Sequence, residues 1–303
     1  MISLFKEIEE VLGSSHERYF GSKYLQTKQI FRKSSCTKIS DREVEFSGTG
    51  SVVFPSIWSV KNSKIQEPHL SSIDAIEFAM QVVPEIHAEF GGVRDISYGQ
   101  IIRLEIVAGT NPLKEGLVGF MISGRALLDQ NLGEIEIAMS IGNMRSKIKT
   151  RLASQTVTIV VPPESQIVAI KDLRMDEEEK WITAVLHPSD TSAPGKWSLT
   201  SCFANALQLG QVLLYQIDGI DRGSSNTLWM RKLVITVNEE VAVQNGLQPA
   251  RVALKNFKLL ERGLDRWRCA DIDAVLCGVN IVCSVAHILP DSYAKPGLGF
   301  PTS

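Results

Sequence analysis

Residues 67–83, EPHLSSIDAIEFAMQVV, predict a short loop that leads directly into a buried helix. Pro68 disfavours the α conformation at the residue before it. Ser71, followed three residues later by Asp74, has the S-x-x-D form of a helix capping box. Apolar residues then recur at helical spacing, at positions 73, 76, 79, 80 and 83. His69 is therefore expected just before a helix N-terminus, where free backbone N–H groups and the helix dipole favour a carbonyl oxygen or an anion.

The composition is that of a globular protein with a sizeable core. The chain has 303 residues, of which 44% are hydrophobic, and this length fits one large or two modest domains. The formal net charge is −2 and no basic stripe or tail is present, so nucleic acid and anionic membranes are not favoured as partners. No apolar run reaches membrane-spanning length, and the N-terminus becomes charged too early for a secretory signal. We expect a cytoplasmic location.

The cysteines and histidines indicate neither disulfides nor a metal site. The chain has 5 cysteines, an odd number, and none of them forms a C-x-x-C pair. Reduced, mostly buried thiols fit this pattern better than a disulfide framework or a zinc site. The histidines show no metal-ligand spacing either, so no metal is expected.

The first half of the chain predicts strands on both sides of the buried helix. Residues 3–13 are expected to form a short amphipathic helix. Residues 43–54 are expected to form a strand, or a bent pair of strands broken at the Gly-Thr-Gly of positions 48–50. The buried helix is expected to weaken at Pro84 and to continue with a kink to Gly91-Gly92. Between residues 98 and 158, β-like runs alternate with turn signals.

The second half repeats this order of elements. The motif WSLTSC, residues 197–202, opens a long apolar helix over residues 203–217. Strand-like runs are expected around this helix, at residues 166–170, 181–186, 228–237, 251–260, 267–274 and 279–286.

One long helix wrapped by an antiparallel sheet is the hotdog unit, and both halves have this order of elements. We therefore expect an α+β protein with a tandem (double) hotdog fold, and another α+β sandwich is the alternative. The run at residues 156–161 ends at Pro162-Pro163, the best candidate for a boundary. An N-terminal extension plus the first hotdog would occupy residues 1–162, and the second hotdog residues 163–303.

The two halves differ in the loop before the helix. The first half has His69 there, whereas the second has Trp197-Ser198-Leu199 and no ionisable base. A duplicated fold with one such histidine is expected to keep one working site. The unperturbed pKa of histidine lies near neutrality, so His69 suits acid–base chemistry on a hydroxyl or on a carbon next to a carbonyl. The N–H groups at the helix N-terminus would stabilise the negative charge that develops on the carbonyl oxygen. Alternatively, His69 only hydrogen-bonds a loop.

Other polar residues are weaker candidates. Asp74 would either orient His69 as a second catalytic residue or cap the helix, and the pattern favours capping. Asn205 and Gln208 on the second helix could face the same cleft if the two helices lie side by side, although ordinary polar positions explain them too. Arg231, in a strand after the second helix, could hold a phosphate or carboxylate, and a solvated arginine is the simpler interpretation.

Several common enzyme classes are disfavoured. The chain contains no G-x-G-x-x-G fingerprint, no P-loop, no G-x-S-x-G elbow and no H-E-x-x-H motif. Hydride transfer, NTP hydrolysis, the α/β-hydrolase triad and zinc proteolysis are therefore not expected.

Short motifs along the chain resemble the AvrD (avirulence D) family of plant-associated bacteria. Length and motif order agree with that family across nearly the whole chain. The motifs that carry the resemblance are IEEVLG at 8–13, RYFG at 18–21, PSIWSVK at 55–61, PHLSSIDA at 68–75 and SNTLWMR at 225–231.

The resemblance implies an enzyme of secondary metabolism. The family is associated with the making of syringolides, acyl-sugar lactone elicitors formed from a β-ketoacyl thioester and a pentulose such as xylulose. It is also distantly similar to the A-factor (γ-butyrolactone) synthases, which join a β-ketoacyl group to a three-carbon phosphate and are regarded as hotdog-like. By that analogy His69 would activate the sugar hydroxyl and the N-terminal end of the first helix would bind the thioester carbonyl. Ser71, Ser72 and Asp74 would shape the site, with Asp74 as the second catalytic candidate, and Ser71, Ser72 and Trp58 would bind substrate.

The expected ligands are therefore an acyl thioester, carried by an acyl carrier protein or coenzyme A, and a sugar-like acceptor, with no further cofactor. A double hotdog already contains a pseudo-dimer, and a homodimer remains open. A hotdog dehydratase or thioesterase acting on the same thioester is one alternative. A non-catalytic small-molecule binding protein or effector is the other.

Overall fold

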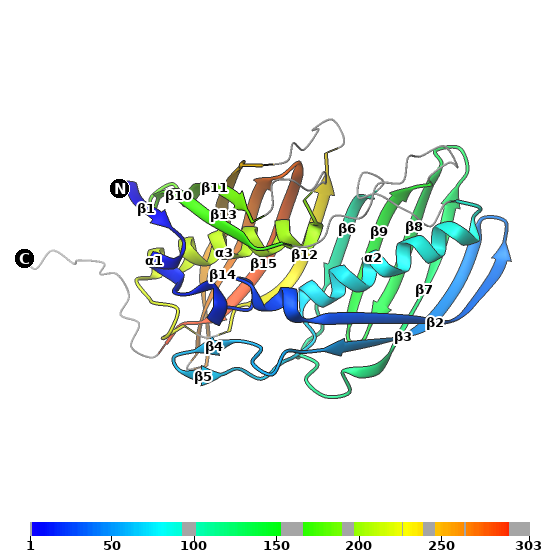
Figure 1. The fold of residues 1–303 in the computed structure, drawn as a ribbon, viewed down its shortest axis with the longest axis horizontal. Helices are drawn as coiled ribbons and strands as arrows, with labels where there is room; N and C mark the ends of the chain where they lie inside the picture. Colours follow the sequence, from blue (N-terminus) through cyan, green and yellow to red (C-terminus); the bar gives the residue numbers. More distant parts are fainter. Residues whose placement is uncertain are drawn as a thin grey trace, which may run out of the picture.

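A single antiparallel sheet forms the framework of the protein (Figure 1). The computed structural model describes residues 2–92, 101–152, 166–189, 197–225, 227–238, 246–263 and 265–290. Within these residues the sheet has 13 strands in the order β1-β10-β11-β13-β14-β15-β12-β6-β9-β8-β7-β3-β2. Every neighbouring pair is antiparallel.

The sheet divides into two parts, each of which covers one long helix. The first part consists of β1 (Ile2–Glu7), β10 (Val168–Asp176), β11 (Trp181–Pro188), β13 (Gln248–Arg262), β14 (Asp265–Leu276), β15 (Val279–Ile288) and β12 (Trp229–Val237). The second part consists of β6 (Ile101–Val107), β9 (Met144–Arg151), β8 (Glu134–Ile141), β7 (Val118–Asp129), β3 (Glu43–Val53) and β2 (Lys28–Ser40). A separate hairpin is formed by β4 (Val60–Lys61) and β5 (Lys64–Ile65).

The two parts of the sheet join where β12 pairs with β6. Leu233 lies opposite Ile106 and Ile235 lies opposite Leu104 in this register. All four side chains are fully buried, so the apolar core continues from one part of the sheet into the other. Burial of each such side chain contributes about 1.5–3 kcal/mol relative to exposure.

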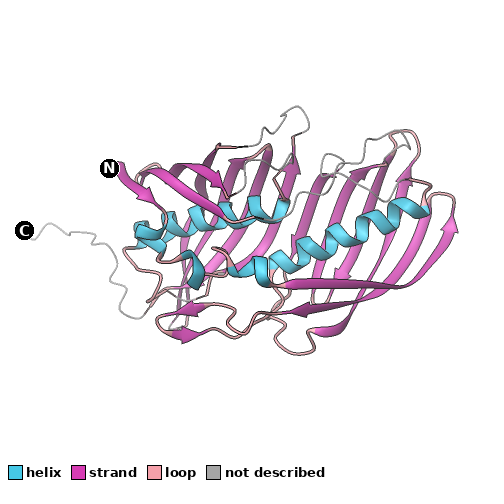
Figure 2. Ribbon diagram, in the orientation of Figure 1, coloured by secondary structure: helices cyan, strands magenta, loops and turns pink. Residues whose placement is uncertain are grey.

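Two long helices, α2 (Ser72–Glu89) and α3 (Leu199–Asp218), lie on the same face of the sheet (Figure 2). Each begins with a serine N-cap, because the side chain of Ser71 accepts from the backbone N–H of Asp74 and that of Ser198 accepts from the N–H of Ser201. Gly219 ends α3 in the left-handed conformation that favours glycine. Shorter helical turns are α1 (Glu9–Leu12), η1 (Ser15–Glu17) and η2 (Lys23–Gln26).

The first turns of the two long helices meet near the middle of the molecule (Figure 1). The hydroxyl of Thr200 on α3 donates to Oε1 of Glu77 on α2 at 2.5 Å. Each half of the molecule is thus one long helix covered by an antiparallel sheet, and the two sheets are continuous. The fold is a tandem (double) hotdog of the α+β class, as the sequence predicted.

The prediction of a helix over residues 3–13 was wrong. The chain forms strand β1 first, in which Leu4 lies opposite Arg174 and Phe5 opposite Leu173 of β10, and only the four residues of α1 are α-helical. A partner strand some 170 residues away satisfies the β1 backbone, which local periodicity cannot reveal. The N-terminal strand therefore pairs with the second half of the sequence.

Strand β3 runs unbroken through Gly48 and Gly50, so the strand and not the bent pair is correct. A Cβ at Gly48 would lie 2.5 Å from the Phe31 ring, and one at Gly50 would lie 2.7 Å from the Phe120 ring. These glycines allow aromatic side chains to lie across the strand and do not end it.

Other boundaries also differ from the sequence prediction. Helix α3 starts at Leu199, four residues before the predicted position. Helix α2 continues through Pro84, as predicted, and ends at Glu89, two residues before Gly91. Strand β2 was missed, because most of its side chains are exposed and show little apolar alternation. The predicted run at 156–161 and the boundary at Pro162-Pro163 lie outside the described residues, so the division into two domains stays a prediction. None of the helices in the described ranges is long and apolar enough to span a membrane.

Candidate functional site

His69 lies in the loop before α2, half-buried between two tryptophans. Its ring meets the indole of Trp58 edge-on, with centroids 4.9 Å apart, and lies 6.1 Å from the ring of Trp229. Trp58 comes from the loop after β3, and Trp229 begins β12. The structure thus brings the predicted base together with one predicted substrate-binding residue, Trp58, and with a tryptophan from the other half of the chain.

Burial lowers the pKa of His69 below its ordinary value of 6.5. A hydrogen bond with the backbone of Glu67 acts in the opposite direction, and the charge of Lys114 adds to the lowering. Lys114 Nζ is itself held 2.5 Å from Glu67 Oε2. The imidazole is therefore neutral at pH 7, which is the form that can accept a proton.

Asp74 and Ser71 form the capping box that the sequence predicts. The backbone N–H of Ser71 donates to Asp74 Oδ2 at 2.8 Å, the Ser71 hydroxyl donates to the same oxygen at 2.7 Å, and the Asp74 N–H donates to Ser71 Oγ at 3.2 Å. Gln29 Nε2 donates to Asp74 Oδ1 at 2.6 Å. The contacts of this carboxylate are those of a helix cap, the interpretation that the sequence pattern favoured.

The fully buried carboxyl of Asp74 has a raised pKa because burial disfavours its charged form, although the hydrogen bonds from Gln29 and Ser71 oppose this effect. The capping box uses the N–H groups of Ser71 and Asp74. An α-helix leaves its first N–H groups without partners inside the helix. Those of Ser72 and Ile73 are therefore the candidates for binding a carbonyl oxygen.

Tyr19 is a site residue that sequence reasoning did not select. Its hydroxyl lies 3.0 Å from Ser71 Oγ, and its ring centroid lies 4.7 Å from that of Trp58. Burial, together with the charge of Asp74, raises the pKa of this tyrosine well above 10, so its hydroxyl stays protonated. The RYFG motif at 18–21 carries part of the family resemblance but gives no local signal of a contact between Tyr19 and the α2 N-cap.

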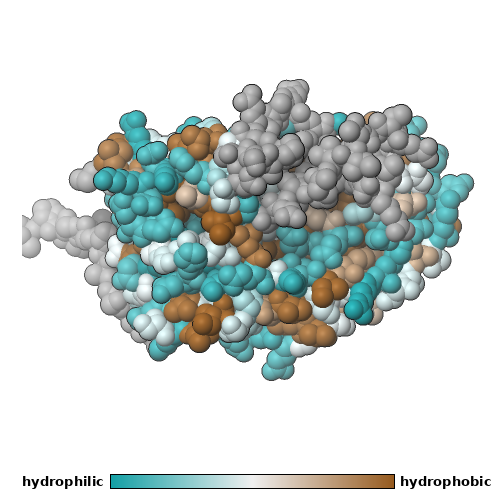
Figure 3. All heavy atoms as spheres, in the orientation of Figure 1, coloured by the Kyte–Doolittle hydropathy of each residue, from teal (hydrophilic) through white to brown (hydrophobic). Residues whose placement is uncertain are grey.

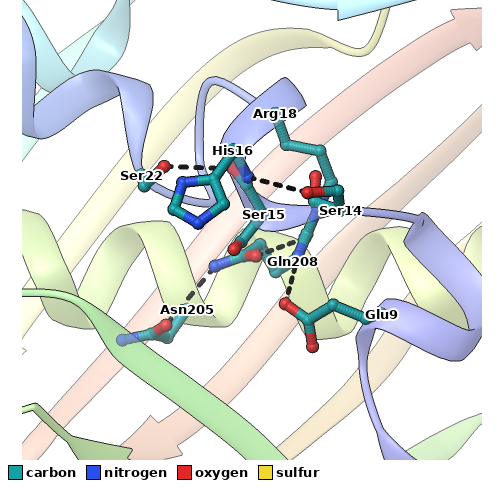
Figure 4. A network of polar contacts seen from close by, with 8 residues as sticks. All are labelled: Glu9, Ser14, Ser15, His16, Arg18, Ser22, Asn205 and Gln208. Carbon is teal, nitrogen blue, oxygen red and sulfur yellow. Dashed lines mark hydrogen bonds and ion pairs between the residues drawn. The ribbon is translucent and has the colours of Figure 1, made fainter.

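Asn205 and Gln208 belong to a second network, centred on Arg18 (Figure 4). The buried guanidinium of Arg18 donates to Gln208 Oε1 and forms an ion pair with Glu9 at 3.1 Å. Gln208 Nε2 in turn donates to Asn205 Oδ1 at 3.4 Å. The N-terminal loop thus lies against α3 and occupies the polar positions that were predicted to face a shared cleft.

Arg231 is exposed on β12, and its backbone carbonyl accepts from the N–H of Ala108 at 3.1 Å. This placement agrees with a solvated arginine. Ser72 is 6% exposed and begins α2. All 5 cysteines are free thiols.

The solved structures that are similar to this chain include two domains of biosynthetic pathways and a thioesterase. A bifunctional dehydratase-cyclase domain from ambruticin biosynthesis is 12% identical with a TM-score of 0.41, and the match covers 88% of this chain and 96% of that one. A pyran synthase domain from module nine of the sorangicin pathway is 13% identical with a TM-score of 0.43, over 86% and 98% of the two chains. An acyl-CoA thioesterase II from Mycobacterium marinum is 8% identical with a TM-score of 0.37, over 86% and 97%.

A comparison with curated proteins found no match. The family model of the Pseudomonas avirulence D protein (AvrD) matches residues 3–173 and 150–290, which together span nearly the whole chain. The chain belongs to the AvrD family.

Proposed function

We propose that this protein is a biosynthetic enzyme of secondary metabolism that transfers or condenses a β-ketoacyl group from a thioester onto a sugar-like acceptor. The product would be an acyl sugar of the syringolide type. The observation that carries the proposal is the placement of a neutral, half-buried His69 beside the N-terminus of α2. Membership of the AvrD family supports the biosynthetic role.

The proposed chemistry uses His69 as the general base. The imidazole takes a proton from a hydroxyl of the acceptor, and the oxygen attacks the thioester carbonyl. The carbon–sulfur bond then breaks, and the leaving thiolate recovers a proton from the imidazolium. While the carbonyl oxygen carries negative charge, the N–H groups of Ser72 and Ile73 stabilise it. In a condensation, the same base would instead remove a proton from the carbon between the two carbonyl groups. That carbon would attack the ketone carbon of the acceptor, and the imidazolium would return the proton to the alkoxide that forms.

The neighbours of His69 support this role in different ways. Trp58 and Trp229 shield part of the imidazole from water, and the partly exposed Trp229 offers apolar surface to an acyl chain. The capping box of Ser71 and Asp74 holds the start of α2 in place. Asn205 and Gln208 have a supporting role, because their network with Arg18 packs the N-terminal loop against α3. Arg231 is exposed and would contact only a ligand that reaches the outer surface.

A hotdog dehydratase or thioesterase is the second candidate, because the same neutral base would serve either reaction on the same thioester. A binding protein without catalysis is the third. We place the reaction in the cytoplasm. The acyl group would be carried by an acyl carrier protein or by coenzyme A. The proposed reaction is compatible with a homodimer.

Mass spectrometry of lipophilic extracts tests the proposal. Cells that express the wild type are expected to accumulate an acyl sugar that cells with His69→Ala lack, while the thermal melt of the variant is unchanged. His87→Ala is the matched control, because that histidine is also buried but lies near the far end of α2. The same product from wild type and His69→Ala would remove His69 from the mechanism.

Purified protein then separates transfer from hydrolysis. With a β-ketoacyl thioester and a pentulose, the proposal predicts an acyl sugar and a free thiol in equal amounts, with little free acid. Release of free acid at the same rate without any acceptor would establish a thioesterase. An enoyl thioester that keeps its carrier would establish a dehydratase.

A further inference from the structure

The loop that carries Trp58 depends on other elements for its position. Its β4–β5 hairpin consists of only two residue pairs. The turn between them places Asn62 and Ser63 in the left-handed region, with φ of 48° and 59°, which is unfavourable for residues other than glycine. An isolated two-stranded hairpin is marginally stable at best. Contacts outside the hairpin must therefore hold it in place.

Packing covers only part of this loop. Ile65 in β5 is 64% exposed, and hydrophobic residues are visible on the surface at the place that the β4–β5 hairpin has in Figure 1 (Figure 3). Trp58, in contrast, is 7% exposed. The exposed hairpin follows the buried indole by a few residues, so a contact that anchors the hairpin also limits the movement of the indole.

Arg222, in the loop after α3, provides such a contact. Its Nη2 donates to the carbonyl oxygen of Val60 at 2.8 Å, two residues after Trp58. The donor is charged, which makes the bond roughly twice as strong as one between neutral groups. The hydroxyl of Ser59 also donates to the carbonyl of Glu17, but at 3.4 Å, near the limit of hydrogen-bond length. Arg222 is therefore the stronger of these two anchors.

The loop of Arg222 is itself held by internal hydrogen bonds. Asp221 Oδ1 accepts from the N–H of Ser224 at 2.7 Å, and the Asp221 carbonyl accepts from the N–H of Ser225 at 3.1 Å. The Ser225 hydroxyl donates to the carbonyl of Arg222 at 3.0 Å. The chain then continues to Trp229 at the start of β12. Arg222 thus links the loop of one tryptophan to the loop that leads to the other.

Both tryptophans lie beside His69, with ring centroids 4.9 Å away for Trp58 and 6.1 Å away for Trp229. We propose that Arg222 is a positioning residue for the His69 site. Its hydrogen bond to Val60 holds the two loops in the relative position at which both indoles lie beside the imidazole. This inference rests on the proposed function, because it concerns the surroundings of the base of that reaction.

Arg222 acts through the tryptophans and not through its own charge. Burial is the largest cause of the lowered pKa of His69, followed by the hydrogen bond with Glu67 and by the charges of Lys114 and Glu67. Arg222 is not among the groups that shift this pKa. Without its bond to Val60, the Trp58 loop can move away from the imidazole and admit water. The pKa of His69 would then rise toward 6.5.

NMR on the full chain tests this inference. Arg222→Met has a side chain without a donor, so the pKa of His69 should rise toward 6.5 and the indole N–H signals of Trp58 and Trp229 should shift. Arg222→Lys keeps a charged donor and should lie closer to the wild type. Lys64→Gln removes a positive charge from an exposed position in the same hairpin and should match the wild type.

A second control separates positioning from a general loss of stability. Thr150→Val removes a buried hydroxyl that lies 3.3 Å from His87 Nε2, and it should lower the melting temperature without moving the His69 titration. Unchanged His69 and indole signals in Arg222→Met would overturn the proposal, and so would an equal shift in Thr150→Val. If Arg222→Met does not fold, Arg222→Gln, with a shorter and neutral side chain, is measured in its place with the same expectation.

Kinetics keep this inference separate from the proposed function. With a β-ketoacyl thioester and a pentulose, Arg222→Met should lower kcat about 10- to 100-fold per folded protein, with a smaller change in KM. If the wild type transfers no acyl group but His69 still shifts in Arg222→Met, the proposed function fails and the positioning role stands. Transfer that requires His69 but proceeds in Arg222→Met with the wild-type kcat would overturn the positioning role and leave the proposed function standing.

Discussion

The imidazole of His69 and the indole of Trp58 meet edge to face, with ring centroids 4.9 Å apart and an interplanar angle of 70°. Trp58 is 7% exposed, so this contact removes one side of the imidazole from water. Tyr19 lies against the other part of the same indole, 4.7 Å away between centroids. The protonation state of the proposed base therefore depends on a loop residue that lies eleven positions before it.

Trp58→Ala should raise the pKa of His69 toward 6.5, because water reaches the ring and stabilises the imidazolium. NMR titration of the imidazole signals measures this directly. The rate of acyl transfer should fall as the pH drops through the His69 pKa, since a protonated ring cannot accept a proton, and this fall should begin at higher pH in the variant. Trp181→Ala, far along the sheet in β11, is the control and should leave the His69 titration unchanged. An unchanged pKa in Trp58→Ala would show that the indole does not shield the imidazole.

The buried, neutral His87 should lower the free energy of unfolding in mild acid, because only the unfolded chain can protonate it there. Its ring is fully buried, Nε2 lies 3.3 Å from the hydroxyl of Thr150, and burial lowers its pKa to about 4. The unfolded chain binds a proton near pH 6.5, so the free energy of unfolding falls as the pH drops from about 6.5 to about 4, by about 3 kcal/mol in total. Urea unfolding at pH 7.5 and pH 4.5 measures the loss.

His87→Gln is the matched variant, because glutamine does not titrate in this range. Its difference in unfolding free energy between the two pH values should be smaller than that of the wild type. An equal difference in both proteins would mean that other groups cause the acid sensitivity.

Asp74→Ala should destabilise the fold and leave His69 unaffected. The change removes acceptors from Ser71 and Gln29 in a buried place and breaks the capping box, at a cost of about 2 kcal/mol. Asp74→Asn keeps one acceptor oxygen and should lower the free energy of unfolding by less than Asp74→Ala does. Urea unfolding gives the free energies, and NMR titration follows His69. If the pKa of His69 moves in Asp74→Asn, then Asp74 orients the base, which is the catalytic role considered for it.

Replacement of Arg268 alone should lower the free energy of unfolding more than replacement of both members of its ion pair with Asp218. Its Nε donates to both carboxylate oxygens of Asp218, at 2.9 and 3.0 Å, and His287 Nε2 lies 3.7 Å from the same carboxylate. Burial would raise the pKa of Asp218, but His287 and Arg268 together lower it. Arg268→Met leaves a buried charge without its main partner and should cost about 3–5 kcal/mol.

The double variant Arg268→Met with Asp218→Asn removes both charges and should recover part of that loss. Chemical denaturation of the wild type, both single variants and the double variant completes the thermodynamic cycle. A double variant that is as unstable as Arg268→Met would show that packing of the arginine stem, including its contact with Phe257, accounts for the loss.

Some features of this protein follow from the sequence alone, because their physical causes are local. Ser71 and Asp74 are three residues apart, and this spacing is sufficient to start α2 with a capping box. Helical periodicity then marks the buried face of α2, and the nearly continuous apolar run of α3 marks a helix that is buried on almost every side. The order of elements in the two halves was sufficient to predict the double hotdog, and the short motifs were sufficient to indicate the AvrD family.

The tertiary structure alone decided which distant residues meet. Strand β1 looks helical in isolation, and it is a strand because β10 supplies its hydrogen-bond partners. Burial lowers the pKa of His69, and the two aromatic rings beside it, Trp58 and Trp229, come from opposite halves of the chain, so the sequence has no local signature of this effect. Arg18 contacts Gln208, 190 residues away, and Arg222 contacts Val60 in the β4–β5 hairpin, 162 residues away. Local rules determine where a helix begins, but charge and burial depend on contacts between residues that only the folded chain brings together.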